Sequence, residues 1–168
     1  MGKTRYVMDG FGYSNVFVVD NYKQSHALYD GYAFELAVCY DEYNSSIRIQ
    51  DMNRYLDGYP ISLPARYTNK QACYEKVFII SNLDLLEQYT HEQQTQPEVW
   101  AAFLRRIHKV IRFMPDGTRR EYDTKDYIIA HKGYNNHNSA FIELPANTST
   151  PFDDMGASVQ NPLEVEQM

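Results

Sequence analysis

The sequence predicts an α/β fold with a mostly parallel sheet, and two observations support this prediction. First, the apolar runs at residues 16–19 and 36–40 are continuous rather than alternating, and an acidic residue directly follows each run. Continuous apolar strands are typical of a sheet that is covered on both faces. Second, the chain has 168 residues and 43% apolar content, which is enough for about one domain with a single sizeable core.

Further elements follow from local patterns. A third apolar strand is predicted over residues 76–80, after a polar segment around Asn69 and Lys70 that favours a loop or hairpin. Apolar residues at helical spacing predict a short amphipathic helix over 49–56, which Gly58 and Pro60 end. Residues 95–98, Thr-Gln-Pro-Glu, predict a capping box with a proline in the first turn of a second amphipathic helix.

The C-terminal third divides into two parts. Residues 110–114 and 119–122 flank a Pro-Asp-Gly turn and predict a β-hairpin. Beyond about residue 145 the composition shifts to Thr, Ser, Pro, Asn and acidic residues, which favours a disordered tail. We therefore expect a core over residues 1–112, a hairpin extension over 113–145 and an acidic tail over 146–168.

The net charge of −6 is unevenly distributed, since five of the six charges lie after Lys132. The remaining chain is close to neutral and holds a basic stretch at residues 105–125, which either approaches phosphate groups or forms an ordinary solvated face. The sequence has no apolar run of the roughly 18 residues that a membrane span needs, so we expect a soluble, cytoplasmic protein. The two cysteines, Cys39 and Cys73, lack the paired spacing of a zinc site and are predicted to be buried thiols.

Three short motifs carry candidate chemistry, and the first is Gly2-Lys3-Thr4. It matches the last three positions of the G-x-x-x-x-G-K-[ST] phosphate-binding loop. In that loop the backbone amides surround phosphate groups, while the lysine and the hydroxyl reach the β- and γ-phosphates and Mg²⁺. The tripeptide alone is weak support, because it arises often by chance.

The second motif is the pair Asp41 and Glu42 at the end of the strand over residues 36–40. Phosphoryl transfer needs one carboxylate in the Mg²⁺ shell and a second group that orients or deprotonates the attacking water. The alternative is a pair of solvated acids at a strand end.

The third motif is Asn82, which follows the strand over residues 76–80. Its amide can donate and accept hydrogen bonds, so it can hold a water against a γ-phosphate, although a lone asparagine here is often a turn residue. The three motifs together are more specific than each alone, because α/β sheets bind ligands at the carboxyl ends of their strands.

In this order the motifs resemble the replication-associated proteins of circular single-stranded DNA viruses and related rolling-circle plasmids, within superfamily 3 helicases. The resemblance runs from Gly2 to about Arg112. It rests on Gly2-Lys3-Thr4, Asp30-Gly31-Tyr32, Tyr40-Asp41-Glu42-Tyr43, Leu56-Asp57-Gly58-Tyr59-Pro60, Leu63-Pro64-Ala65-Arg66-Tyr67-Thr68-Asn69-Lys70, Val77-Phe78-Ile79-Ile80-Ser81-Asn82 and Phe103-Leu104-Arg105-Arg106-Ile107.

The resemblance implies a P-loop, AAA+-like ring helicase that hydrolyses ATP between subunits and draws a single strand of DNA or RNA through a central channel. The resemblance also implies a role for each candidate site residue. Gly2, Lys3 and Thr4 form the end of the Walker A loop, Asp41 and Glu42 the Walker B pair, Asn82 the motif C sensor, Thr4 and Asp41 the Mg²⁺ ligands, Lys70 the channel-loop contact to nucleic acid, and Arg105 or Arg106 the arginine finger.

The chain also departs from this family. Only Met1 precedes Gly2, so we expect the first glycines and the first strand of the phosphate loop, as well as the endonuclease part, to be missing. Two hypotheses follow. The chain is either the ATPase portion of a replication helicase, or a non-catalytic nucleic-acid-binding or assembly module derived from one. In a eukaryotic virus the location would be the nucleus rather than the cytoplasm.

Overall fold

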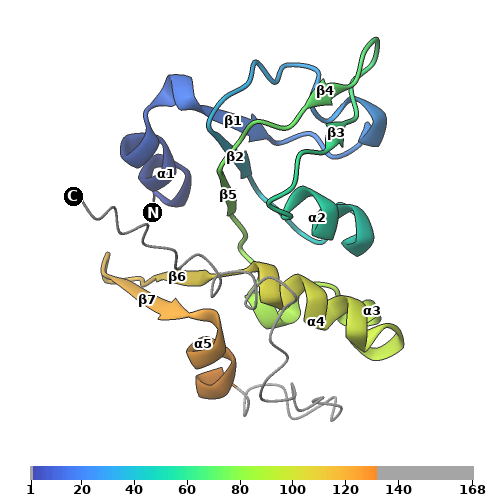
Figure 1. The fold of residues 1–168 in the computed structure, drawn as a ribbon. Helices are drawn as coiled ribbons and strands as arrows, with labels where there is room; N and C mark the ends of the chain where they lie inside the picture. Colours follow the sequence, from blue (N-terminus) through green and yellow to red (C-terminus); the bar gives the residue numbers. More distant parts are fainter. Residues whose placement is uncertain (1, 132–168) are drawn as a thin grey trace, which may run out of the picture.

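The computed structural model describes residues 2–131 and has a mixed α/β fold around a three-stranded parallel sheet (Figure 1). The strands are β1 (Val16–Val19), β2 (Ala37–Tyr40) and β5 (Lys76–Ile79), in the order β1-β2-β5. The predicted parallel sheet and all three of its predicted strands are therefore confirmed. The predicted tail over residues 146–168, and residues 132–145 of the predicted extension, lie outside the described residues.

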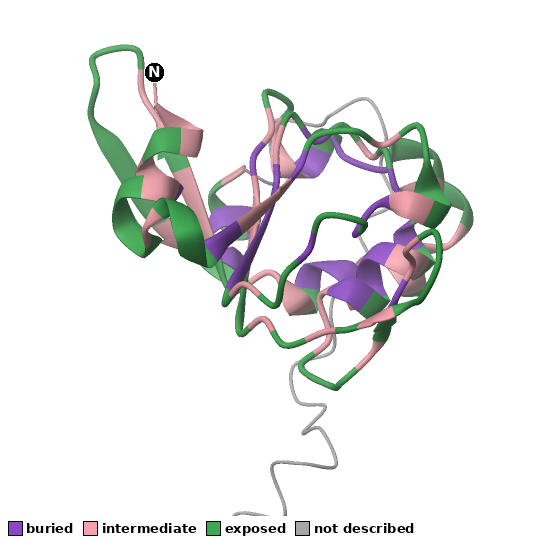
Figure 2. Ribbon diagram, turned by 90° about the horizontal axis from the view of Figure 1, so that it is seen from above, coloured by how far each residue is buried: buried purple, intermediate pink, exposed green. Residues whose placement is uncertain are grey.

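The sheet is covered on both faces, as its continuous apolar strands predict. Ala37 and Cys39 of β2 pack toward α1 (Lys3–Phe11), in a cluster that includes Val7. The alternate residues Val38 and Tyr40 pack into the main core on the opposite face. Every residue of β2 is completely buried, because this strand lies in the middle of the sheet (Figure 2).

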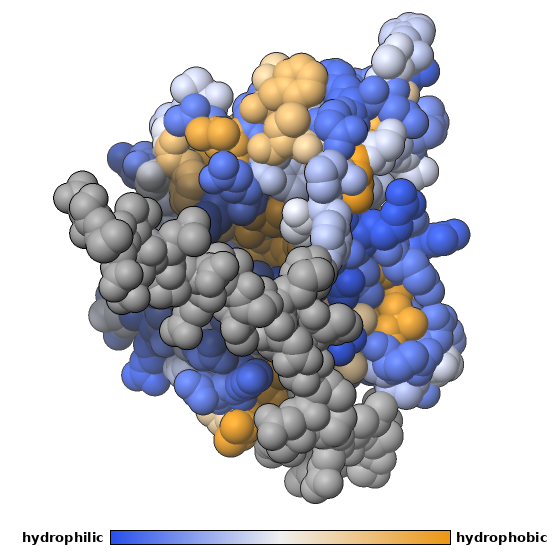
Figure 3. Space-filling view, viewed as in Figure 1, coloured by the Kyte–Doolittle hydropathy of each residue, from blue (hydrophilic) through white to orange (hydrophobic). Residues whose placement is uncertain are grey.

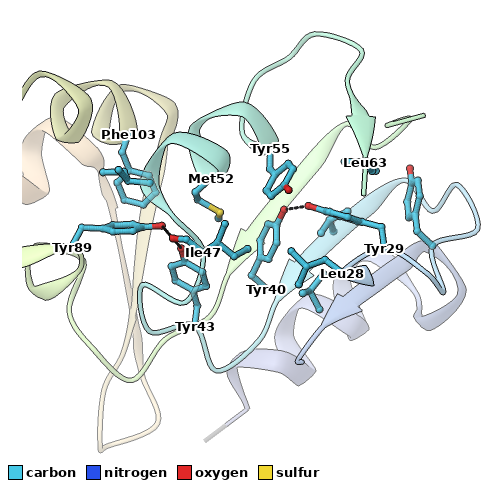
Figure 4. Packing of buried hydrophobic residues seen from close by; sticks show 14 residues of the cluster. Leu28, Tyr29, Tyr40, Tyr43, Ile47, Met52, Tyr55, Leu63, Tyr89 and Phe103 are labelled. Carbon is cyan, nitrogen blue, oxygen red and sulfur yellow. Dashed lines mark hydrogen bonds between the residues drawn. The ribbon is translucent and has the colours of Figure 1, made fainter. Parts of the chain in front are cut away.

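The main core is rich in tyrosine, and its hydroxyl groups pair within it (Figure 4). Tyr29 and Tyr40 share one hydrogen bond between their hydroxyls, and Tyr43 and Tyr89 share another. Tyr89 also donates to the backbone oxygen of Ile47 at 2.8 Å. These pairs let large rings fill the core without leaving buried hydroxyls unpaired.

The remaining helices flank this core. They are α2 (Ile49–Tyr55), α3 (Thr90–Thr95), α4 (Pro97–Arg106) and α5 (Thr124–His131), with 3₁₀ turns η1 (Tyr13–Asn15), η2 (Ser25–Ala27) and η3 (Leu85–Glu87). The predicted helix over 49–56 is confirmed as α2, and α4 begins at Pro97 as expected. Within residues 2–131 no helix has the length and apolarity to cross a membrane. The face drawn in Figure 3 is mainly hydrophilic, with small separate apolar patches.

Two small antiparallel pairs complete the fold. In the first, β3 (Ser62–Leu63) pairs with β4 (Lys70–Gln71), which agrees with the predicted loop or hairpin before β5. In the second, β6 (Lys109–Phe113) pairs with β7 (Arg119–Asp123), which confirms the predicted hairpin. Its turn has Gly117 at φ 84°, a left-handed conformation that favours glycine. β6 spans residue 112, where the core was expected to end.

Two local predictions were wrong. Thr95 does not cap α4: it is the last residue of α3, and its hydroxyl donates to the backbone oxygen of His91. Gln96 is the N-cap residue of α4, and its side chain makes no capping hydrogen bond. Cys73 is exposed rather than buried, because it lies in the short loop between β4 and β5. Cys39 is buried as predicted, and burial raises the pKa of its thiol to about 12.

Because the core contains several buried tyrosines, we expect the protein to lose stability at alkaline pH. Burial raises the pKa of Tyr43 from 10.0 to about 12, and burial raises the pKa values of Tyr29, Tyr40 and Tyr89 still further. The stabilisation from neutral, buried tyrosine is fully present below the unfolded-state pKa near 10 and is lost as pH rises through the folded-state values. Each such group contributes about 1.4 kcal/mol of destabilisation per pH unit.

We therefore expect the midpoint of urea unfolding to fall steeply above about pH 10, while the last tyrosines ionise only as circular dichroism is lost. Tyrosinate absorbance and circular dichroism along one pH titration check this. Complete ionisation of tyrosine in a chain that keeps its native circular dichroism would contradict the packing in Figure 4.

Candidate active site

The predicted site residues gather at the carboxyl edge of the parallel sheet. The register aligns Val19, Tyr40 and Ile79 across the three strands, so the residues after β2 and β5 leave the sheet side by side. The first turn of α1 packs against the same edge. Five predicted residues make direct contacts there: Lys3, Thr4, Asp41, Glu42 and Asn82. We call these five residues the edge cluster.

Lys3 joins α1 to the end of β5. Its ammonium donates to the backbone oxygen of Ser81 at 2.7 Å and to Oδ1 of Asn82 at 2.6 Å. The lysine side chain is half-buried, and neither of these two partners carries a negative charge. A cation held only by neutral oxygens remains available to an anionic ligand, which would compete with these oxygens for its protons.

Thr4 joins α1 to the end of β2. Its hydroxyl lies 3.1 Å from each carboxylate oxygen of Asp41 and shares its single proton between them. A threonine hydroxyl and one carboxylate on neighbouring elements are hard oxygen ligands. They suit a cation that completes its shell with water and phosphate.

Glu42 and Asn82 connect the ends of β2 and β5. The Asn82 amide donates to Oε2 of Glu42 at 2.8 Å, while its oxygen accepts from Lys3. Glu42 has φ 48°, a left-handed conformation that costs about 1–2 kcal/mol in a residue with a side chain. The backbone N–H of Glu42 donates to Oδ1 of Asp41, which helps to hold this conformation. Such strain is concentrated at functional sites.

The N-terminus of α1 adds to the edge cluster backbone N–H donors that lack intrahelical acceptors. Gly2 caps the helix at φ 88°, and the first intrahelical bond runs from the N–H of Tyr6 to the oxygen of Gly2. The N–H groups of Lys3, Thr4 and Arg5 precede this bond, and such first-turn donors lack intrahelical acceptors. Together with the helix dipole and the Lys3 ammonium, they favour binding of an anion.

The donors present fit Mg²⁺ better than a transition metal. Within residues 2–131 no group of three or more His, Cys, Asp and Glu side chains is placed to hold a metal ion. Mg²⁺ does not need such a cage, because it keeps several waters and is bound through one or two carboxylates plus phosphate oxygens. Thr4 and Asp41 would be its ligands in this chain.

The other predicted residues lie away from these contacts. The Lys70 ammonium donates to the backbone oxygens of Asp30 and Tyr32 at 2.6 and 2.5 Å. Arg106 forms a bidentate ion pair with Asp57, at 3.2 and 3.1 Å, and donates to the oxygen of Ala102. Arg105 is exposed at the end of α4 and forms no ion pair within the described residues. The two arginines are thus in different environments.

Sequence reasoning missed Tyr22. Its hydroxyl lies 2.6 Å from the backbone oxygen of Asp41 and 3.0 Å from that of Val19, so it joins the ends of β1 and β2. Burial raises the pKa of this hydroxyl, which keeps it protonated and able to donate. No motif marks this tyrosine, since it lies in the irregular segment after β1 and its partners are backbone atoms.

No protein-family model matches the chain, and comparison with curated proteins likewise finds no match.

The contact between Thr4 and Asp41 can be tested without any ligand. In a double-mutant cycle of Thr4→Val and Asp41→Asn, we expect a coupling energy of about 0.5–2 kcal/mol, because a half-buried hydroxyl donates to a charged acceptor. The matched control is the exposed pair Arg5 and Asp9 on the same helix, 3.2 Å apart, for which we expect about 0.3–0.5 kcal/mol.

Urea unfolding of the single and double variants gives both coupling energies. A value for Thr4 and Asp41 no larger than that of the control pair would show that α1 does not dock on the end of β2 through this contact.

Proposed function

We propose that this chain is the ATP-hydrolysing portion of a replication initiator helicase, which couples hydrolysis to movement along single-stranded DNA or RNA. The observation that carries the proposal is the continuous chain of contacts from Lys3 through Asn82 to Glu42, beside the contact of Thr4 with Asp41. Support for the replication role comes from the order of the motifs, which resembles superfamily 3 helicases. The proposed partners are ATP, Mg²⁺ and a single strand, and the proposed assembly is a homo-oligomeric ring.

Each side chain of the edge cluster has a chemical task in this proposal. Lys3 and the first-turn amides of α1 hold the β- and γ-phosphates, while Thr4 and Asp41 hold Mg²⁺. When bound there, Mg²⁺ would neutralise phosphate charge. Glu42 orients the attacking water and accepts its proton, and Asn82 holds the water in line.

The contact of Lys3 with Asn82 also connects phosphate binding to the position of the attacking water. A phosphate is a stronger acceptor for an ammonium than a neutral amide oxygen, so nucleotide binding draws Lys3 away from Asn82. The freed Oδ1 of Asn82 can then accept a hydrogen bond from water, while its amide still donates to Glu42. Nucleotide binding and placement of the water are linked through this exchange of partners.

The first experiment compares Lys3→Ala and Glu42→Gln in the 168-residue chain. We expect Lys3→Ala to weaken binding of a fluorescent ATP analogue at least about tenfold, because a charge-assisted contact to phosphate is lost. We expect Glu42→Gln to retain that binding and to lower phosphate release at least about a hundredfold. The matched control is Glu75→Gln, an exposed glutamate outside the edge cluster, which should change neither quantity.

The outcomes separate the two hypotheses. Equal loss of nucleotide binding in the glutamate variants and the lysine variant would point to misfolding, which circular dichroism detects. Nucleotide binding without measurable hydrolysis in the unchanged chain would favour the non-catalytic module. If the folded chain neither binds nor hydrolyses ATP, the proposal is overturned.

The second experiment tests which of the two arginines is the arginine finger, which contacts a nucleotide bound to a neighbouring subunit. Arg105 is exposed and has no ion-pair partner among residues 2–131, so it is available to a nucleotide on a neighbouring subunit, where a guanidinium stabilises developing phosphate charge. The side chains of Arg106 and Asp57 are only 27% and 33% exposed, so their ion pair has a structural role.

We expect Arg105→Ala to lower hydrolysis at high protein concentration without changing the free energy of unfolding. Arg106→Ala should lower that free energy by about 1–3 kcal/mol, because Asp57 loses a bidentate partner. Phosphate release and urea unfolding measure the two effects. If Arg105→Ala leaves hydrolysis intact at every protein concentration, the role in trans is refuted.

A further inference from the structure

Two arginines lie directly opposite each other on one face of the β6–β7 hairpin (Figure 1). The register pairs Arg112 with Arg120, so both side chains leave the same face of the two strands. The adjoining pair on this face, Val110 and Tyr122, packs against residues of α4 and α5. The two arginines therefore continue this face beyond the apolar contact, toward the turn of the hairpin. We call Arg112 and Arg120 the arginine pair.

Arg112 lies beside the last residue of α5 and is only partly neutralised. It donates to Nε2 of His131 at 3.1 Å. Because a guanidinium only donates, Nε2 accepts, and Nδ1 of the neutral ring donates to the oxygen of Tyr127 at 2.8 Å. The carboxylate of Asp84 lies 3.8 Å from Arg112 and already accepts from the N–H of Leu86 and from the Tyr127 hydroxyl. Arg112 thus keeps much of its positive charge.

Arg120 is exposed and forms no ion pair with the residues that the structure describes. The carboxylate that senses it is that of Asp116, in the turn. Hydrogen bonds from Thr118, at 2.8 and 2.6 Å, lower the pKa of Asp116, and Arg120 adds to this effect. Like charges directly opposite each other destabilise a pair of strands. An anion that bridges the two guanidinium groups would remove this repulsion.

The chain itself supplies anions close to this point. After Lys132 it carries five acidic residues and no lysine or arginine, and four of the acids lie within residues 153–166: Asp153, Asp154, Glu164 and Glu166. The chain leaves α5 at His131, in contact with Arg112. Twenty-one residues separate His131 from Asp153. This length is ample, since the five-residue strands of the hairpin extend over only about 17 Å.

We propose that residues 153–166, which lie outside the described residues, bind the arginine pair of the same chain through their carboxylates. A carboxylate accepts two hydrogen bonds, so one acid can bridge both guanidinium groups. A ligand on the same chain acts at an effective concentration on the order of millimolar, so individually weak ion pairs suffice. The bound segment covers this face of the hairpin and competes there with any other anion. The inference is independent of the proposed function.

The test measures how fast a glutamate-specific protease cleaves the full chain after Glu164 and after Glu166, with mass spectrometry of the products. At about 20 mM salt we expect Arg120→Gln to raise both initial rates at least about threefold, because a bound segment must detach before it enters the protease. At about 500 mM salt the difference between the two chains should disappear. Arg120 is exposed, so the variant should keep the circular dichroism of the unchanged chain.

Arg48→Gln is the matched control, because the Arg48 side chain is 76% exposed but precedes α2, apart from the hairpin (Figure 1). It should leave both cleavage rates unchanged. Exchange of the charges gives a second check. Arg120→Glu alone should accelerate cleavage, and its combination with Asp153→Lys and Asp154→Lys should slow cleavage again. A variant that only disturbed the hairpin would not be rescued in this way.

Equal cleavage rates in the unchanged chain and in Arg120→Gln at low salt would overturn the inference, as would a charge exchange that fails to restore protection. Protection that increases with protein concentration would also overturn it, since the segment would then bind a second copy of the chain. The arginine pair lies outside the edge cluster. Arg120→Gln should therefore leave nucleotide binding unchanged, and Lys3→Ala should leave both cleavage rates unchanged.

Discussion

The parallel pairing of β2 with both β1 and β5 is the constraint on which the rest of the structure depends. β2 is buried along its whole length, with Ala37 and Cys39 against α1 and with Val38 and Tyr40 in the main core. Because side chains alternate between the faces, a shift of one residue would exchange these two sets. The larger Tyr40 would then meet the α1 side, where Ala37 and Cys39 now fit. The register that packs the core is therefore also the register that aligns Tyr40 with Ile79, the last residues of β2 and β5, and so brings Asn82 within reach of Glu42.

The elements that the sequence predicts are those with a strong local pattern. Continuous apolar runs predict β1, β2 and β5, the spacing of Ile49 and Met52 predicts α2, and Pro-Asp-Gly predicts the turn between β6 and β7. Helices α1 and α5 were not predicted. In α1, Val7, Met8 and Phe11 do fall at helical spacing, but the helix has only nine residues and Val7 alone among them is buried. In α5, the apolar residues are not confined to one face. Helices this short depend on tertiary contacts for their stability.

For the edge cluster, too, the sequence predicts the residues but not their contacts. The types and spacing of Lys3, Thr4, Asp41, Glu42 and Asn82 marked them as candidates, because chemistry restricts which side chains handle phosphate and water. Their contacts, which join residues 37 to 79 positions apart, follow from the sheet register. The different environments of Arg105 and Arg106 could not be predicted, since Asp57 is 49 positions away from its partner. For the same reason Lys70, a candidate contact for nucleic acid, could not be recognised as an anchor of its loop.

Tyrosine hydroxyl groups form hydrogen bonds both in the core and at the edge of the sheet. In the core they bond to one another, which restricts how the rings can rearrange. At the edge of the sheet, the Tyr22 hydroxyl forms a hydrogen bond with the backbone oxygen of Asp41. Asp41 is thereby fixed through its main chain from one side and through its carboxylate, by Thr4, from the other. The Tyr22 side chain also lines a groove that Asp51 and Tyr55 of α2 line as well, and its displacement would remove one of these two restraints on Asp41. The edge cluster is therefore organised by its surroundings as well as by its own side chains.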